Sequence, residues 1–297
     1  MWEPIFVSSR RIDAARVGRG FPATVEGLWC TGDLSGLAVP CIAIVGTRAA
    51  TPYGRRLARA FAADLGRAGC CIVSGLALGI DRAAHEGALD AGAPTIGILG
   101  GGHRHFFPRA NRGLAERMIA AGGAVLSPYP PDHVVFPSQF LARNGIVAAL
   151  ADAVVIIEAP SRSGALNTAG WAAGRVPVLA VPGDVDRKHV QGCLALIRDG
   201  ATLARSAADV LEALGRMALI ASPVPPAGTR DPIARALLAA LDAGAAEFDE
   251  IVAASGVVPS VALSTLAVLE LDGAVESQGG SRYARVAAPS RGEEPSR

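Results

Sequence analysis

The sequence predicts an α/β protein in which a parallel sheet has helices on both faces and a small C-terminal domain follows. Two observations support this prediction. Short apolar runs rich in β-branched residues alternate with helical segments as far as about residue 215, which is the pattern of a parallel sheet. The prolines between residues 222 and 229 then interrupt this alternation, and further amphipathic helices follow.

We therefore divide the chain into five parts, each with its own sequence character. They are a lead-in segment at 1–40, an α/β domain at 41–220, a linker at 221–230, a small helical domain at 231–288 and a disordered tail at 289–297.

Composition excludes several classes of protein. The 297 residues are 51% hydrophobic, which is enough for a large core. No apolar run reaches the ~18 residues of a membrane span, and no signal-peptide core follows the N-terminus. Five cysteines without CxxC spacing predict buried thiols in a reducing compartment rather than disulfides or a metal site. We expect a cytoplasmic protein with no membrane partner, metal or cofactor.

The first βα unit gives the clearest prediction of a binding site. Residues 41–45 predict a buried strand that ends at Gly46-Thr47-Arg48, and Thr51 is expected to cap the next helix. At the carboxyl end of such a strand, backbone amides and the helix N-terminus favour an anion. Gly46 lets the backbone approach a phosphate, Thr47 offers a hydroxyl and Arg48 a guanidinium for a phosphate or a base. The alternative is a tight turn with a solvated Arg48.

The same alternation predicts the remaining elements of the α/β domain. We expect strands near 70–73, 95–99, 124–126, 153–157 and 176–181, helices near 83–91, 111–121, 138–150, 161–171 and 190–198, and a last strand and helix near 201–215. In the lead-in segment, residues 28–30 predict a short strand. Residues 128–137 contain four prolines and predict a rigid surface loop.

The C-terminal domain predicts a winged helix. Helices are expected at 233–241 and 248–254 and from 258 onward, the third with Leu263, Leu266 and Leu269 on one face, and a hairpin is expected at 273–286. Residues 230–289 contain four Arg against eight acidic residues, a net charge of −4. The third helix contains neither Lys nor Arg.

Polar and glycine-rich motifs follow the predicted strands in a fixed order. They are Gly46-Thr47-Arg48, Ser74-Gly75-Leu76-Ala77-x-Gly79-Ile80-Asp81-x-x-Ala84-His85, Phe107-Pro108-x-x-Asn111, Phe136-Pro137 with Arg143-Asn144, Ser163-Gly164-x-x-x-Thr168 and Val181-Pro182-Gly183. This order resembles the DprA (Smf) family of DNA-processing proteins. The resemblance extends from about residue 27 to 214, and the winged helix is similar to that family's C-terminal module.

The resemblance implies an extended Rossmann-like core that binds single-stranded DNA, protects incoming DNA and loads the RecA recombinase in natural transformation. It also implies a homodimer formed through the large domain and no catalytic residue. The nucleic-acid-binding residues that it implies are Gly46, Thr47, Arg48, Arg109, Phe136, Arg143, Asn144, Ser163, Gly164 and Thr168. Arg48 is expected to contact phosphate and Phe136 to stack on a base.

Four further residues are expected to shape the floor of the site. They are Ser74, Gly75, Gly79 and Asp81, with Asp81 as a helix N-cap. His85 is expected to be a packed histidine rather than a catalyst.

The chain also departs from the family pattern. Gly145 stands where the family often has a second Arg, and His133 stands where a Lys is common. Gly192-Cys193-Leu194 replaces a Gly-Thr-Asn-like turn. Each lost phosphate contact would lower the affinity for DNA and its salt dependence.

Two other functions are compatible with parts of the sequence. Related Rossmann-like proteins cleave nucleotide N-glycosidic bonds, but the Glu that their motif places shortly after Thr168 is absent, and Glu158 is the carboxylate nearest to this motif. The winged helix could serve a duplex-DNA regulator, but groove-reading helices normally carry several cations and its third helix has none.

Overall fold

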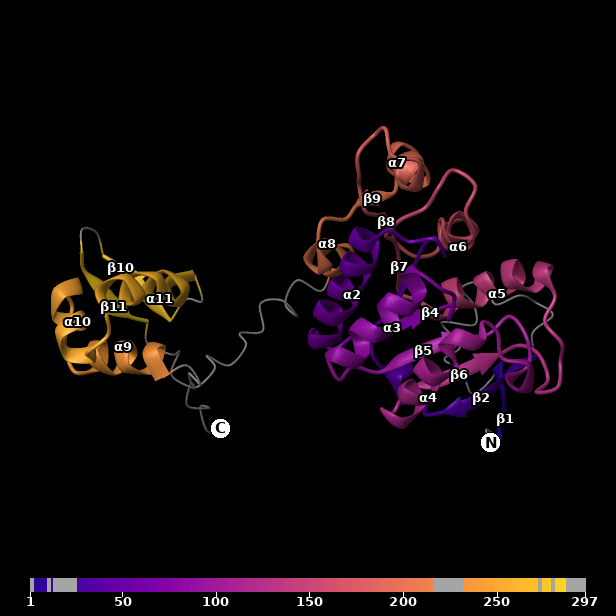
Figure 1. Cartoon of the computed structure of the whole chain (residues 1–297), viewed down its shortest axis with the longest axis horizontal. Helices are drawn as coiled ribbons and strands as arrows, with labels where there is room; N and C mark the ends of the chain where they lie inside the picture. Colours follow the sequence, from indigo (N-terminus) through magenta and orange to yellow (C-terminus); the bar gives the residue numbers. More distant parts are fainter. Residues whose placement is uncertain are drawn as a thin grey trace, which may run out of the picture. The chain divides into compact units, whose positions relative to one another are not determined.

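The computed structural model describes residues 3–9, 12, 26–215, 232–271, 274–278 and 281–286. The predicted linker at 221–230 and tail at 289–297 lie outside these residues. The chain divides into two compact units, Met1–Ala221 and Ser222–Arg297, which we describe separately (Figure 1).

The larger unit is built on one nine-stranded sheet with the order β1-β2-β6-β5-β4-β3-β7-β8-β9. The strands are β1 Ile5–Ser8, β2 Gly27–Gly32, β3 Cys41–Val45, β4 Cys71–Ser74, β5 Thr95–Ile98, β6 Ala124–Ser127, β7 Ala153–Ile156, β8 Val178–Ala180 and β9 Thr202–Leu203. The seven strands from β3 to β9 pair in parallel, as the alternation with helices predicts.

The sheet is mixed rather than purely parallel, which corrects the sequence prediction at one edge. β2 pairs antiparallel with β6, and β1 pairs antiparallel with β2. Strand β1 was not predicted, because two of the four residues in its short apolar run are exposed. The lead-in segment therefore extends the sheet by two strands.

Helices cover both faces of the sheet, as predicted (Figure 1). They are α2 Pro52–Arg67, α3 Ile80–Asp90, α4 Arg112–Ala120, α5 Pro137–Leu150, α6 Gly164–Ala172, α7 Gln191–Arg198 and α8 Ala207–Ala213. Successive residues of β3 point to opposite faces, so Ile42 and Ile44 pack with residues of α2 and α3, while Ala43 and Val45 pack with residues of α5 and α6. All five cysteines are buried free thiols, as the composition predicts.

The strand order reverses beside β3. From β3 the chain adds β4, β5 and β6 on one side, and β7, β8 and β9 lie on the other side. The carboxyl ends of β3 and β7 are therefore neighbours at a topological switch point, where open α/β sheets form a crevice for ligands.

The smaller unit is a winged helix with its own apolar core. It contains α9 Pro232–Asp242, α10 Phe248–Ser255, α11 Pro259–Leu271, and a hairpin of β10 Val275–Ser277 and β11 Tyr283–Arg285. The predicted face of α11 is corrected at one position. Ala262, Leu266 and Leu269 face the core at i, i+4 and i+7, whereas Leu263 is 54% exposed because it lies one step around the helix.

Within the described residues, no single helix is long and apolar enough to cross a membrane. Of the helices in the described residues, only α10 and α11 taken together have the length and composition of a membrane span, and a 109° bend separates them.

Candidate nucleic-acid interface

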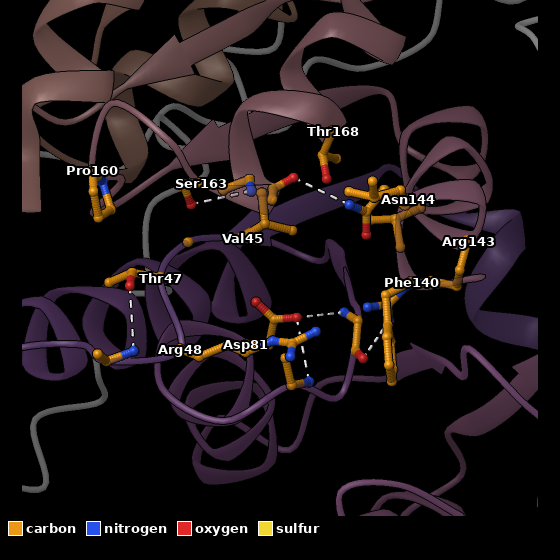
Figure 2. Close-up of a pocket in the computed structure, with 18 of the residues that line it drawn as sticks. Val45, Thr47, Arg48, Asp81, Phe140, Arg143, Asn144, Pro160, Ser163 and Thr168 are labelled. Atoms are coloured by element: carbon orange, nitrogen blue, oxygen red, sulfur yellow. Dashed lines mark hydrogen bonds between the residues drawn. The ribbon is translucent and has the colours of Figure 1, made fainter. Parts of the chain in front are cut away.

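A cavity of about 320 Å³ opens at the carboxyl end of β3, at the switch point of the sheet (Figure 2). The cavity brings together most of the predicted site residues: Gly46, Thr47, Arg48, Gly75, Asp81, Arg143, Asn144, Ser163, Gly164 and Thr168. The predicted residues Ser74, Gly79, Arg109 and Phe136 do not line it. We call this space the strand-end cavity.

An arginine and an aromatic ring meet at this cavity. The guanidinium carbon of Arg48 lies 4.9 Å from the centre of the Phe140 ring, which is the geometry of a cation–π contact. Arg48 is exposed, and it has no carboxylate partner among the described residues. Its charge is therefore available to an anion that enters the cavity.

The cavity contains Phe140 where we expected Phe136. Phe136 is the N-cap residue of α5 and is 55% exposed outside the cavity, near the ring of His133. Phe140 lies one helical turn further along α5, and its ring centre lies 5.9 Å from that of Phe107. Sequence reasoning missed Phe140, although its spacing from Arg143, Asn144 and Val147 on one helix face was a usable signal.

Arg143 is more deeply buried than a phosphate-binding arginine is expected to be. It is 4% exposed, and its guanidinium donates hydrogen bonds to the carbonyl oxygens of Gly75 and Ile98. Burial lowers the pKa of Arg143 to about 10, and the neighbouring Asp81 opposes this shift. Arg143 therefore ties α5 to the ends of β4 and β5, and only part of it reaches the strand-end cavity.

Asp81 holds the loop between β4 and α3. It lies inside the first turn of α3 and not at the N-cap, so this part of the prediction was wrong; Gly79 is the N-cap residue. The Asp81 carboxylate accepts hydrogen bonds from the backbone N–H groups of Gly75 at 3.0 Å and Ala77 at 3.4 Å. Burial raises the pKa of Asp81, and the positive charge of Arg143 and these hydrogen bonds counteract the rise.

Two left-handed residues give this loop its shape. Leu76 has φ 53° and Gly79 has φ 81°. A side chain on Gly79 would collide with the backbone of Thr47, so only glycine fits there. The Asn111 amide donates to the carbonyl oxygens of Leu76 at 2.9 Å and Ala77 at 3.0 Å, which gives the Phe-Pro-x-x-Asn motif a role in holding the loop.

The N-terminus of α6 forms the opposite wall. Ser163 caps this helix, and its hydroxyl accepts from the backbone N–H of Ala165 at 3.3 Å. The Asn144 amide donates to the Gly164 carbonyl at 3.1 Å and so joins α5 to α6 (Figure 2). A helix N-terminus presents unpaired N–H groups and a partial positive charge, both of which favour a phosphate.

Other cavity residues were absent from the prediction. Arg162 lies just before the Ser163 cap and is exposed, which adds a second accessible cation beside Arg48. Leu141 and Pro160 add apolar surface. Arg109 is exposed on a short 3-10 helix (Arg109–Asn111) outside the cavity.

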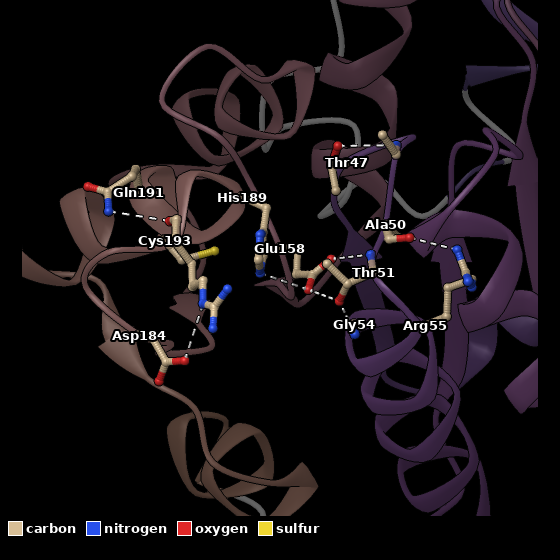
Figure 3. A network of polar contacts seen from close by, with 12 residues as sticks. Thr47, Ala50, Thr51, Gly54, Arg55, Glu158, Asp184, His189, Gln191 and Cys193 are labelled. Atoms are coloured by element: carbon tan, nitrogen blue, oxygen red, sulfur yellow. Dashed lines mark hydrogen bonds and ion pairs between the residues drawn. The ribbon is translucent and has the colours of Figure 1, made fainter.

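Glu158, the carboxylate nearest to the Thr168 motif, is buried and hydrogen-bonded to Thr51 (Figure 3). Its side chain is 2% exposed and accepts hydrogen bonds from the backbone N–H of Thr51 at 2.9 Å and the Thr51 hydroxyl at 2.5 Å. His189 Nε2 lies 3.7 Å from the same carboxylate. Glu158 does not line the strand-end cavity, and the described residues contain no group of His, Cys, Asp or Glu side chains that could hold a metal ion.

Two known protein-family models match this chain. The family model for DNA recombination-mediator protein A matches residues 19–215, and the model for the DprA winged helix domain matches residues 221–281. The DNA processing protein DprA of Mycobacterium tuberculosis is 42% identical over 262 residues, which cover 85% of this chain and 67% of that protein. DprA of Bacillus subtilis is 39% identical over 175 residues, 58% of each chain.

Two solved structures share the fold. DNA processing protein A of Streptococcus pneumoniae matches with a TM-score of 0.64 and 35% identity, over 71% of this chain and 74% of that one. DNA processing protein A of Helicobacter pylori, whose structure describes its binding of single-stranded DNA, matches with a TM-score of 0.64 and 30% identity, over 72% of this chain and 97% of that one. The two family models and these relatives agree, and the chain belongs to the DprA (Smf) family of DNA-processing proteins.

Proposed function

We propose that this protein binds single-stranded DNA in the strand-end cavity and acts as a recombination mediator without chemistry of its own. The observation that carries the proposal is the exposed Arg48 guanidinium over the Phe140 ring, beside the N-terminus of α6. A cation, an aromatic face and free backbone N–H groups are what a phosphate and an adjacent base require, whatever the sequence of the DNA. The binding of single-stranded DNA by the Helicobacter pylori relative supports the same function for this chain.

The cellular part of the proposal follows from family membership. We propose that the protein protects incoming single-stranded DNA and loads RecA recombinase in natural transformation, in the cytoplasm and as a homodimer. The family description as a recombination-mediator protein supports this assignment.

The position of Glu158 supports a binding function over N-glycosidic cleavage. A general acid must reach the leaving base, whereas the Glu158 carboxylate is occupied by Thr51 and lies outside the cavity. The winged helix offers little to duplex DNA, because α11 has no cation.

The first prediction concerns the cavity residues. Arg48→Ala should weaken binding to a single-stranded oligonucleotide by at least about fivefold at ~0.1 M salt. Each phosphate contact contributes ~0.7 to the slope of log affinity against log salt concentration, which corresponds to about fivefold at ~0.1 M relative to ~1 M. Phe140→Ala should also weaken it, since a base stack contributes ~1–3 kcal/mol. Fluorescence anisotropy measures both affinities, and thermal unfolding shows whether each variant is folded.

Phe136→Ala is the matched control, because it removes a phenylalanine ring at the N-cap of the same helix, outside the cavity. It should leave the affinity unchanged. Folded Arg48→Ala and Phe140→Ala variants with wild-type affinity would remove the strand-end cavity from the DNA-binding surface, and tighter binding of duplex than of single strands would reject the proposal.

A further inference from the structure

A second cavity, of about 580 Å³, lies over α2 and α3. Five arginines line it: Arg48, Arg55, Arg56, Arg59 and Arg82. The other lining residues are Leu78, Gly79, Ala83 and Glu86. We call these five residues the arginine surface. Arg48 also lines the strand-end cavity, so the two cavities adjoin at this side chain.

The fold gathers these cations from two helices in close contact. Arg55 and Arg56 lie on one turn of α2 and Arg59 on the next, and Arg82 lies on α3; all four are exposed. The helices approach closely because Gly87 lies against the backbone of Arg59, where any side chain would collide. The small residues of α3 therefore bring its arginine beside those of α2.

The positive charge of this surface is only partly neutralised by the protein. Arg59 pairs with Asp90, with Nη2 2.9 Å from Oδ1, and Arg82 pairs with Glu86 at 2.9 Å. Arg55 donates to the Ala50 carbonyl at 2.6 Å, and Arg56 lies 5.2 Å from the Tyr53 ring centre.

Among the described residues, Arg48, Arg55 and Arg56 have no carboxylate partner. Like charges four residues apart on a helix, as at Arg55 and Arg59, repel one another. An external anion would relieve this repulsion.

We propose that the arginine surface binds the phosphates of the same DNA strand as it leaves the strand-end cavity. The inference rests on the proposed function and extends its site beyond the ends of the strands. A single strand is flexible enough to turn at Arg48 from one cavity into the next, whereas duplex DNA stays stiff over ~150 base pairs. Leu78 is 41% exposed in the second cavity and offers apolar contact to a sugar or base.

The test uses two lengths of oligothymidylate with the full chain, about 4 and about 12 nucleotides, which are within the range of single-strand site sizes. In Arg55→Gln/Arg56→Gln, the long oligonucleotide should bind about 25-fold more weakly at ~0.1 M salt, with the log–log salt slope reduced by ~1.4 for two lost phosphate contacts. The short oligonucleotide, which fills only the strand-end cavity, should keep its wild-type affinity. Arg56→Gln alone, which breaks no hydrogen bond to any described residue, should reduce the slope by ~0.7.

The matched control is Arg67→Gln/Arg117→Gln, which removes two exposed arginines outside both cavities and should change neither affinity. Wild-type binding of the long oligonucleotide by Arg55→Gln/Arg56→Gln would overturn the inference while leaving the proposed function intact. Equal weakening at both lengths, or a loss confined to duplex DNA, would also overturn it. A wild-type protein that binds neither length would reject both the inference and the proposed function.

Discussion

The hydrogen bonds of His85 fix the state of this fully buried side chain on α3. The Thr95 hydroxyl donates its hydrogen to the Ile72 carbonyl at 2.8 Å, so it must accept from His85 Nδ1, which lies 2.7 Å away. Within the part of the chain that the structure describes, His85 Nε2 has no hydrogen-bond partner. Protonation would place a buried N–H there, and burial lowers the pKa of His85 to about 3.

This histidine predicts a loss of stability in mild acid. The unfolded chain binds a proton near pH 6.5 and the folded chain near pH 3, so the free energy of unfolding should fall as the pH drops between these values. From pH 6.5 to 5 the loss due to His85 should approach ~2 kcal/mol, at 1.36 kcal/mol per pH unit. Urea unfolding of the wild type and of His85→Leu at both values measures it. An equal acid loss in both proteins would contradict the argument.

Individual site residues could be predicted only where their place after a strand is enough to bring them to the cavity. Gly46, Arg48 and Ser163 follow predicted strands, and the structure brings them into one cavity. Phe136 and Phe140 both lie at the start of one helix, so only the orientation of α5 decides which ring lines the cavity. The burial of Arg143 depends on packing against Gly75 and could not be predicted from spacing.

At the scale of elements, Glu158 joins the end of β7 to the start of α2. Its carboxylate accepts from the N-cap residue Thr51, whose hydroxyl in turn accepts from the backbone N–H of Gly54 at 3.0 Å. A side chain on Gly54 would collide with this carboxylate. The glutamate therefore fixes the helix start in place of an external ligand.

Glu158→Gln should destabilise the fold without any effect on chemistry. Replacing a charge-assisted hydrogen bond at a buried helix N-terminus should lower the free energy of unfolding by ~1–3 kcal/mol, which urea unfolding measures. Incubation of the wild type with nucleoside monophosphates should release no free base, as followed by chromatography. Base release by the wild type that Glu158→Gln abolishes would favour the N-glycosidase alternative.

The elements themselves were largely predictable, because each inner strand is a short apolar run followed by a helix. β3 and its helix follow the prediction closely, with Thr51 as the cap. β1 and the antiparallel pairing of β2 were not predicted, because pairing direction depends on tertiary contacts with β6 and not on local pattern.

At the scale of the whole molecule, charge separates the two units. Residues 230–289 have a net charge of −4, whereas the exposed cations Arg48 and Arg162 line the cavity in the larger unit. A chain that ends at Ala221 should therefore bind single-stranded DNA as tightly as the full chain, and slightly more tightly at low salt, because an acidic module repels phosphates. Anisotropy titrations over a range of salt concentrations should give the same slope for both chains.

An isolated module of residues 230–289 is the control, and it should bind neither single-stranded nor duplex DNA. Loss of binding by a folded chain that ends at Ala221, or duplex binding by the isolated module, would move the contact away from the larger unit.

The reversal of strand order beside β3 has a consequence for synthesis of the protein. One wall of the cavity follows β3, early in the chain, and the opposite wall is the start of α6, which is made much later. Domains fold as units while the chain emerges from the ribosome. A nascent chain that has been made as far as β6 has six of the nine strands but only one wall of the cavity, so it cannot enclose a nucleotide until β7 and α6 have joined it.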